Sequence, residues 1–405
     1  MDAVTSGFDV AHATGGDWRD LTESCLSALE SLPPGANLGF VYVSDSLDED
    51  LRSIINRLRE ATRIHDWVGT VGFGVCVSGE EMFDLPAMAI MVGAVPRESF
   101  RILPTVGPED RDLPLEIHKW ARAQKAVFGI VHADPRVPGI ERTLSHIQNQ
   151  TGAFLVGGLT ASRGAVQEQI AGEVTEGGVS GILLGGDLGA TVGLTQGCSP
   201  IGPVHDVTRG RDNVVLMLDN RPAFEVFRED IGELLARDLK RIEGYVHAAI
   251  PIPGRDTGDY LVRNLLGVYP EKGWVSIGEK VGVGDRVMFV RRDGQSAMAD
   301  LKRMVADVKR RSGGRPKAAF YISCVARGPN LFGAGSVELK TIASILGDDI
   351  PLIGFFANGE ISGDRLYGYT GFLLRLSRRA TCAPVCPACA AGCPMHAGSI
   401  PTICI

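Results

Sequence analysis

Five cysteines near the end of the chain are the residues with the plainest capacity for chemistry. Four follow the spacing Cys-x3-Cys-x2-Cys-x3-Cys, and a histidine and a fifth cysteine, Cys404, come after them. Thiolates at such spacing can ligate zinc, copper(I) or an iron–sulfur cluster. The sequence therefore predicts a metal site with the ligands Cys382, Cys386, Cys389, Cys393 and His396.

Other interpretations of this tail stay open. Its outer spacings match no standard zinc module, and a terminal segment rich in proline, alanine and glycine is often disordered. Cys386-Pro387 and Cys393-Pro394 look like the Cys-Pro dipeptides of haem-responsive segments, with His396 as a second ligand. Exposed thiols of lowered pKa also form reversible disulfides. The cofactor is thus unidentified, with haem or a soft metal ion as the candidates.

A second set of polar residues follows apolar runs or lies in glycine-rich hairpins. In parallel α/β units ligands usually bind beyond the carboxyl ends of the strands, so side chains there are candidates for a binding site. The Asn-Gly pair that precedes Glu360 is first of all a hairpin signal. The ligand-binding residues predicted from this set are Cys324, Arg327, Asn358, Glu360, Ser162, Arg163, Gln196 and His132.

Two of these residues have an alternative role. Cys324 could be the nucleophile of a thiol enzyme if a neighbour such as Arg327 stabilises its thiolate. Gln196 opens the stretch 196–203, which suits either a binding loop or a tight connection between domains. We predict no catalytic residue, because the sequence lacks a phosphate-binding loop, a Gly-x-Ser-x-Gly elbow and a His-Glu-x-x-His motif.

The elements that must position these residues recur three times along the chain. Each time an apolar strand is followed by a helix with an apolar face, a second strand and, after a polar glycine-rich hairpin, a third strand. The first strands are expected at 37–43, 126–132 and 319–324, the helices at 51–61, 140–148 and 337–346, the second strands at 67–72, 154–160 and 351–356, and the third strands at 88–95, 179–184 and 369–374.

This order predicts an α/β fold with mixed sheets built from repeated β-α-β-β units. The first two strands of each unit should be parallel, because a helix connects them. Gly69, Gly157 and Gly354 each lie in the second strand of their unit, where glycine weakens a strand unless close packing requires it. Their recurrence favours related units.

A second domain is expected to begin near Asn220. The stretch 214–218 is typical of a strand, and Pro222 opens a helix that should run through Leu239. A further strand is expected at 286–290. A chain of 405 residues is also longer than one core usually supports, so two domains are expected.

Composition excludes several classes of protein. Apolar residues make up 44% and charged residues 22%, as in ordinary globular proteins. The net charge is -7 and the basic residues do not cluster along the sequence, so nucleic acid is not an expected partner. The apolar runs are far shorter than the roughly 20 residues that span a bilayer, and the first residues lack the pattern of a secretory signal. We therefore expect a cytoplasmic protein without a membrane partner.

Two groups of motifs resemble a known family. Residues 196–203, Val207-Thr208 and 218–223 look like the end of a FIST N-terminal domain, and residues 323–328, 351–360 and 369–371 look like a FIST C-terminal domain. The resemblance covers most of residues 30–376. It places a FIST N-like domain at 30–220, a FIST C-like domain at 221–376 and a cysteine- and proline-rich tail at 377–405.

The resemblance implies an intracellular sensory protein without established catalysis. Small ligands such as amino acids are proposed for the family, and haem-based sensing of nitric oxide is associated with some bacterial members. Since no output domain is attached here, the signal is expected to pass through a separate partner protein. A haem or metal sensor that uses the tail, with a histidine such as His132, is the alternative.

Overall fold

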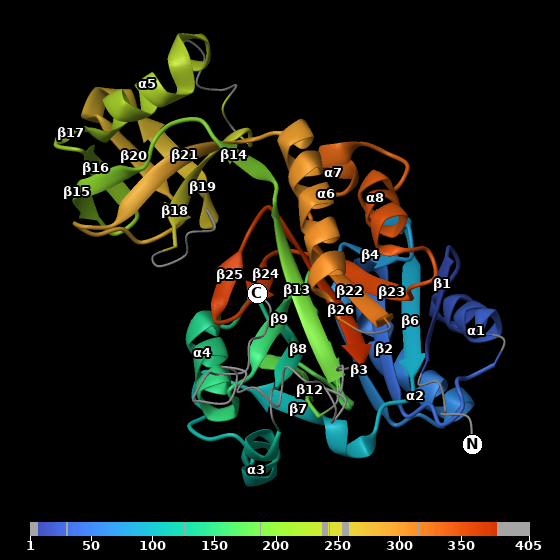
Figure 1. Cartoon of the computed structure of the whole chain (residues 1–405). Helices are drawn as coiled ribbons and strands as arrows, with labels where there is room; N and C mark the ends of the chain where they lie inside the picture. Colours follow the sequence, from blue (N-terminus) through green and yellow to red (C-terminus); the bar gives the residue numbers. More distant parts are fainter. Residues whose placement is uncertain are drawn as a thin grey trace, which may run out of the picture. The chain divides into compact units, whose positions relative to one another are not determined.

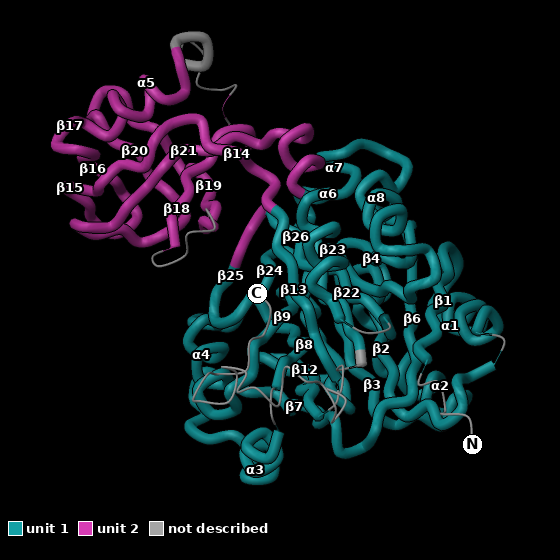
Figure 2. The backbone as a smooth tube through the Cα atoms, viewed as in Figure 1, with its two compact units in different colours: residues 1–195, 301–366, 370–405 teal, residues 196–300, 367–369 magenta. Residues whose placement is uncertain are grey.

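The computed structural model describes residues 7–29, 31–124, 127–186, 188–236, 242, 244–252, 259–313 and 316–378. The chain forms two compact units, coloured teal and magenta in Figure 2. Unit 1 comprises residues 1–195, 301–366 and 370–405, and unit 2 comprises residues 196–300 and 367–369. Both units contain helices and strands (Figure 1), so the expected α/β class with mixed sheets is confirmed. The predicted tail ligands lie outside the described residues.

Unit 1 contains all three expected repeats. The first is β2 (Leu38–Ser44), α2 (Leu51–Thr62), β3 (Asp66–Gly72) and β6 (Ala87–Gly93); the second is β8 (Phe128–Ala133), α4 (Ile140–Thr151), β9 (Phe154–Leu159) and β12 (Val179–Leu184); the third is β22 (Pro316–Cys324), α8 (Val337–Leu346), β23 (Leu352–Ala357) and β26 (Thr370–Arg378). In each repeat the first strand pairs in parallel with the second and antiparallel with the third. The β-α-β-β order is confirmed.

The crossover helices form because their apolar residues recur on one face. In α2 the buried positions Leu51, Ile54, Ile55 and Leu58 follow helical spacing and pack on the strands of the first repeat. The helix ends at Arg63, which adopts the left-handed conformation of a C-cap. Gly152 ends α4 in the same way.

The glycine of each second strand has the same surroundings. A Cβ atom built on Gly69 would lie 1.7 Å from the carbonyl oxygen of Val41, and on Gly157 and Gly354 it would lie 1.7 Å from those of Val131 and Tyr321. Each of these oxygens belongs to the partner residue on the first strand. The first and second strands therefore approach too closely for any side chain at this position.

The hairpins that follow the second strands do not return to their own repeats. The hairpin β4–β5 (Gly74–Val77, Glu80–Phe83) of the first repeat pairs with β23 of the third, β10–β11 (Gln169–Ala171, Glu173–Thr175) of the second pairs with β3 of the first, and β24–β25 (Glu360–Ser362, Arg365–Tyr367) of the third pairs with β9 of the second. In each exchange the middle residue pair includes the glycine of the second strand described above. The three pairs are Gly354 and Cys76, Gly69 and Ile170, and Gly157 and Ile361. The three repeats thus exchange hairpins in a cycle.

The remaining elements of unit 1 extend this frame. They are β1 (Phe8–Thr14), α1 (Trp18–Ala28), β7 (Phe100–Val106), α3 (Leu115–Ala123), β13 (Leu188–Gln196, whose last residue falls in unit 2) and α7 (Pro329–Phe332). Strands β1 and β7 extend the sheets of the first and second repeats, and β13 pairs with β26 of the third. Helix α6 (Gly294–Arg311) begins in unit 2 and ends in unit 1.

Unit 2 is built around a closed barrel of six strands. Its order is β21 (Arg286–Arg292), β15 (His205–Arg211), β16 (Val214–Leu218), β20 (Trp274–Ile277), β19 (Tyr260–Tyr269) and β18 (Val246–Pro251), and β18 pairs back to β21. The short strands β14 (Cys198–Pro200) and β17 (Arg221–Pro222) pair at its edges. Helix α5 (Ala223–Ala236) packs on the barrel core, where Phe227 contacts Phe289. The strands expected at 214–218 and 286–290 are present.

The compact units interleave the sequence segments expected at 30–220 and 221–376. The barrel takes residues from both sides of Asn220, and the third repeat returns to the unit formed by the first two. The boundaries of the two compact units therefore differ from a single division of the sequence near residue 220. Among the described residues, no helix is long and apolar enough to cross a membrane.

Candidate functional site

Three predicted residues from separate segments meet in unit 1. Cys324 ends β22, Arg327 follows it in the loop, and Glu360 begins the exchanged strand β24. The Cys324 thiol and the Arg327 guanidinium both lie close enough to Glu360 to lower the pKa of its carboxyl. We call Cys324, Arg327 and Glu360 the thiol–carboxyl cluster.

Glu360 is fully buried in this cluster. Its Oε2 accepts hydrogen bonds from the backbone N–H of Thr370 at 3.3 Å and from the Thr370 hydroxyl at 2.7 Å, whereas Oε1 has no hydrogen-bond partner among the described residues. Burial raises the pKa of Glu360 to about 8, and the bonds from Thr370, the Cys324 thiol and the charge of Arg327 oppose that rise without cancelling it. At neutral pH the carboxyl is therefore mostly protonated.

This pKa predicts how the stability of the protein depends on pH. The folded state holds the Glu360 proton up to about pH 8, whereas an unfolded Glu loses it near pH 4.5. Protonation of Glu360 contributes fully to the free energy of unfolding below the unfolded pKa, and this contribution is lost as pH rises toward 8. The free energy of unfolding, measured by urea denaturation at pH 5 and pH 8.5, should fall more in the wild type than in Glu360→Gln, which keeps the neutral form. An equal fall in both proteins would contradict the assignment; Glu176→Gln, at an exposed position, should behave like the wild type.

Arg327 is held by a carboxylate that sequence reasoning did not single out. Glu338 of α8 accepts hydrogen bonds at Oε1 from Arg327 Nε at 2.7 Å and from the Tyr321 hydroxyl at 2.6 Å. Its Oε2 accepts from the Ser323 hydroxyl at 3.1 Å and from the backbone N–H of Gly328 at 3.0 Å. Both charged side chains are fully buried, so this network fixes the loop after β22.

An exchanged hairpin adds a third carboxyl. Glu81 of β5 accepts a hydrogen bond at Oε1 from the backbone N–H of Leu339 at 3.0 Å, in the first turn of α8. Its own N–H donates to the Ser336 hydroxyl. Burial raises the pKa of Glu81 to about 7, although the hydrogen bond from the Leu339 N–H lowers it. The hairpin of the first repeat thus caps a helix of the third.

The other predicted residues of unit 1 lie elsewhere. Asn358 is exposed at the turn between β23 and β24. His132 is buried on β8, where Nε2 lies 3.1 Å from the Tyr42 hydroxyl and the ring packs against Phe355. Burial lowers the pKa of His132 to about 3, so the imidazole is neutral.

Ser162 and Arg163 lie in a surface group of opposite charges. The Ser162 hydroxyl donates to Asp48, and the Arg163 guanidinium pairs with Asp84 and lies over the Phe73 ring at 5.4 Å. The backbone N–H of Arg163 donates to Asp45. These contacts join the hairpin region of the second repeat to the first, and Arg163 stays more than half exposed, at 57%.

Gln196 lies in unit 2. Its backbone N–H donates to Asp300 at 2.8 Å, and its side-chain amide donates to the carbonyl oxygen of Tyr260 at 3.3 Å. Both contacts join separate segments of that unit.

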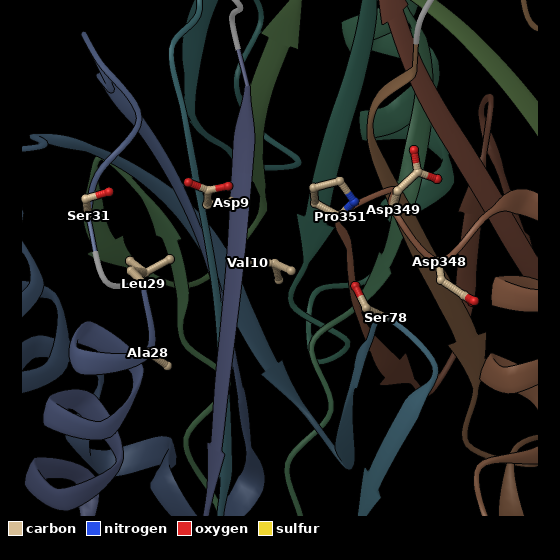
Figure 3. A pocket seen from close by; sticks show the side chains of 9 residues that line it. All are labelled: Asp9, Val10, Ala28, Leu29, Ser31, Ser78, Asp348, Asp349 and Pro351. Carbon is tan, nitrogen blue, oxygen red and sulfur yellow. The ribbon is translucent and has the colours of Figure 1, made fainter.

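Unit 1 contains an open cavity that none of the predicted residues lines. It has a volume of ≈ 370 Å³ and is bordered by acidic and small side chains (Figure 3). The residues around it are Asp9, Val10, Ala28, Leu29, Ser31, Ser78, Asp348, Asp349 and Pro351. Its described lining includes three carboxylates and no basic side chain, and the cavity is open, so it offers no enclosed apolar surface for a ligand.

A larger cavity lies in unit 2 against two barrel strands, and we call it the β18–β19 cavity. Its volume of ≈ 600 Å³ falls within the range of small-molecule pockets. It is lined by Ile242, Gly244, Val246, His247, Asn264, Leu265, Leu266, Gly267, Val268 and Tyr369. Aliphatic side chains thus surround a small number of polar groups, as in most ligand pockets.

His247 is the buried polar group of this cavity. It is 2% exposed, and neither ring nitrogen makes a hydrogen bond of good geometry with a described residue, although the backbone of Gly244 lies near enough to raise the pKa of the ring. Burial lowers the pKa of His247 to about 4, and the nearby charge of Arg292 lowers it further. The ring centroid lies 4.3 Å from that of Tyr369, whose hydroxyl donates to Asn264 Oδ1 at 2.6 Å. With the backbone of Gly244 beside the ring N–H, the unprotonated nitrogen of this neutral imidazole is the acceptor that it offers to a molecule in the cavity.

Sequence reasoning did not find this cavity. His247 lies inside the apolar run 246–250, and nothing nearby repeats or matches a known motif. The available signal was a single histidine within a strand, which is typical of a core residue as well. Tyr369 was noted only as part of a family motif.

Comparison with known proteins agrees with the recognised motifs. The FIST N domain matches residues 37–221 and the FIST C domain matches residues 223–363. An uncharacterized protein of Mycobacterium tuberculosis is 31% identical over 369 residues, which covers 87% of this chain and 94% of that protein. An uncharacterized protein of Mycobacterium bovis is 34% identical over 233 residues, or 54% of this chain and 59% of that protein. The chain therefore belongs to the FIST family, whose domains are thought to be sensory or signalling domains.

Proposed function

We propose that this chain is an intracellular sensory protein that binds a small ligand in the β18–β19 cavity and signals through a separate partner protein. The observation that carries the proposal is His247, a buried and neutral side chain that lines a cavity of ≈ 600 Å³ and whose ring nitrogens make no hydrogen bond of good geometry with a described residue. Buried polar atoms in folded proteins almost always have a hydrogen-bond partner. A ligand in the cavity would supply it.

The surroundings of His247 support a binding role over a purely structural one. The walls are fixed by strand pairing on both sides, because His247 pairs with Asn264 of β19 and with Val290 of β21. Tyr369 has a φ of 63°, a left-handed conformation that is rare for a bulky residue. Such backbone conformations cluster at ligand sites, where the surrounding structure holds a side chain in place.

The thiol–carboxyl cluster supports a different role for the predicted residues. Arg327 and Glu360 are fully buried and Cys324 is 6% exposed, and none of them lines either cavity. We propose that this cluster stabilises the third repeat and that ligand contact falls to His247, Asn264 and Tyr369.

A thermal-shift screen of cellular metabolites tests the proposed function. At least one small molecule is expected to raise the melting temperature of the full chain, because binding to the folded state alone stabilises it. The shift should disappear in His247→Phe and persist in His118→Phe, which makes the same change on α3 of unit 1. A ligand whose stabilising effect survives in His247→Phe would place its site elsewhere and overturn the proposal for this cavity.

A further inference from the structure

The β18–β19 cavity also limits the chemistry of the molecule it can bind, on the premise that the proposed function holds. Among its lining residues that the structure describes, none is Lys, Arg, Asp or Glu. A charged group that packs against these side chains loses hydration and meets no opposite charge among them, since Arg292, whose charge acts on His247, is not one of the lining residues. The lining therefore disfavours a ligand that is an ion or a zwitterion.

Aliphatic side chains supply most of the contact surface. Ile242, Val246, Leu265, Leu266 and Val268 line the cavity together with the ring of Tyr369. Burying apolar area against such walls is favourable, roughly in proportion to the area removed from water. The body of the ligand should accordingly be apolar.

The polar groups specify a hydrogen-bond donor on the ligand. The Tyr369 hydroxyl is already engaged as a donor to Asn264 Oδ1. His247 is neutral, so one of its ring nitrogens is an unprotonated acceptor; the Gly244 carbonyl cannot donate to it, and it has no partner among the described residues. An N–H or O–H group of the ligand would satisfy this nitrogen.

We infer that the β18–β19 cavity binds a neutral, largely apolar small molecule that donates one N–H or O–H hydrogen bond to His247. This class excludes free amino acids, which are zwitterions at neutral pH. The family resemblance had suggested amino acids as ligands, and the lining of this cavity points to another class.

Three related probes separate the features of this inference. Indole is neutral and apolar and carries one N–H donor; 1-methylindole has the same body without the donor; L-tryptophan carries the same ring and donor with a zwitterionic group. Their binding to the full chain is measured by titration calorimetry at pH 7.5. Indole should bind, and 1-methylindole should bind about tenfold more weakly or worse, because the buried nitrogen of His247 then lacks a partner. L-Tryptophan should bind at least about tenfold more weakly because its charges are not compensated.

Two variants assign the binding to His247. His247→Phe should weaken indole binding about tenfold or more and remove the difference between indole and 1-methylindole. His247→Gln, which keeps an acceptor, should retain part of that difference, whereas His118→Phe should leave all three affinities unchanged.

The outcomes distinguish the inference from the function on which it rests. If L-tryptophan binds as tightly as indole and loses affinity in His247→Phe, the cavity is a ligand site and the neutral class is wrong. If indole and 1-methylindole bind equally, the hydrogen bond donated to His247 is wrong. If none of the three probes binds and no metabolite in the thermal screen depends on His247, both the inference and the proposed site are overturned.

Discussion

Gly157→Ala is expected to destabilise unit 1 by about 4 kcal/mol or more, or to prevent the chain from folding. The new Cβ atom would lie 1.7 Å from the carbonyl oxygen of Val131, a backbone atom that cannot turn aside. The strands β8 and β9 would have to separate at Val131, and Gly157 also pairs with Ile361 of the exchanged strand β24. One methyl group would therefore disturb two strand pairings at once.

Denaturation in urea, followed by circular dichroism at 25 °C, measures this effect. Gly152→Ala is the matched control: Gly152 has a positive φ but no atom within 4 Å of a built Cβ, so the change should lower the free energy of unfolding by only about 1 kcal/mol. The equivalent changes Gly69→Ala and Gly354→Ala should behave like Gly157→Ala. If Gly157→Ala is no less stable than Gly152→Ala, the close approach of the strands is wrong.

Arg327→Met is expected to destabilise the chain by about 3–5 kcal/mol, because it leaves the buried Glu338 carboxylate without its counter-charge. The Tyr321 hydroxyl, the Ser323 hydroxyl and the Gly328 N–H would still donate to Glu338, but they do not neutralise it. The loop that follows Cys324 would lose the side-chain bond that holds it to α8. Loss of this one guanidinium should therefore affect both the ion pair and the thiol–carboxyl cluster.

Two further variants test the cause of that loss. The double variant Arg327→Met/Glu338→Leu removes the stranded charge and should recover a large part of the stability, since apolar replacements of buried ion pairs are often tolerated. Arg57→Met breaks the exposed pair with Glu23 and should lower stability by about 0–1 kcal/mol. A double variant that is much less stable than Arg327→Met alone would show that the hydrogen bonds, and not the charge, hold this loop.

The repeats of unit 1 could be predicted because their signals are local. A strand, a helix face such as that of Leu51, Ile54 and Leu58, and a second strand each depend on nearby residues. The glycines at 69, 157 and 354 indicated correctly that the three units are alike, because the same close approach of two strands requires glycine at each position. The exchange of hairpins could not be predicted, because strands such as β4 and β23 pair across more than 270 positions by register and twist that no short segment encodes.

The residues of the thiol–carboxyl cluster could be identified from the sequence in part, although their predicted role in ligand binding stays a prediction. Cys324, Arg327 and Glu360 do meet, because a strand end and the following hairpin were correctly placed near one another. Asn358, only two residues from Glu360, is exposed instead, because it lies in the turn between β23 and β24 and belongs to neither strand. The partners that give the cluster its charge balance, Glu338 and Glu81, come from a helix and from a hairpin of another repeat, so the sequence around Cys324 does not indicate them.

His247 shows the same limit in unit 2. Whether a histidine in an apolar strand is a satisfied core residue or a ligand contact depends on what covers it. Here the cover includes Tyr369, more than a hundred residues later in the chain, whose ring packs against the imidazole. Such a contact is visible only once the fold is known.

Nuclear magnetic resonance of the full chain, labelled with ¹⁵N at the histidine rings, tests the central claim most directly. The His247 signals are assigned from their absence in His247→Phe and are followed during titration with indole at pH 7.5. The account predicts that they begin as those of a neutral imidazole and shift saturably, at indole concentrations matching the calorimetric affinity, while the signals of His118 and His132 stay unchanged. Indole binding that leaves the His247 signals in place, or a His247 ring that is charged at this pH, would contradict it.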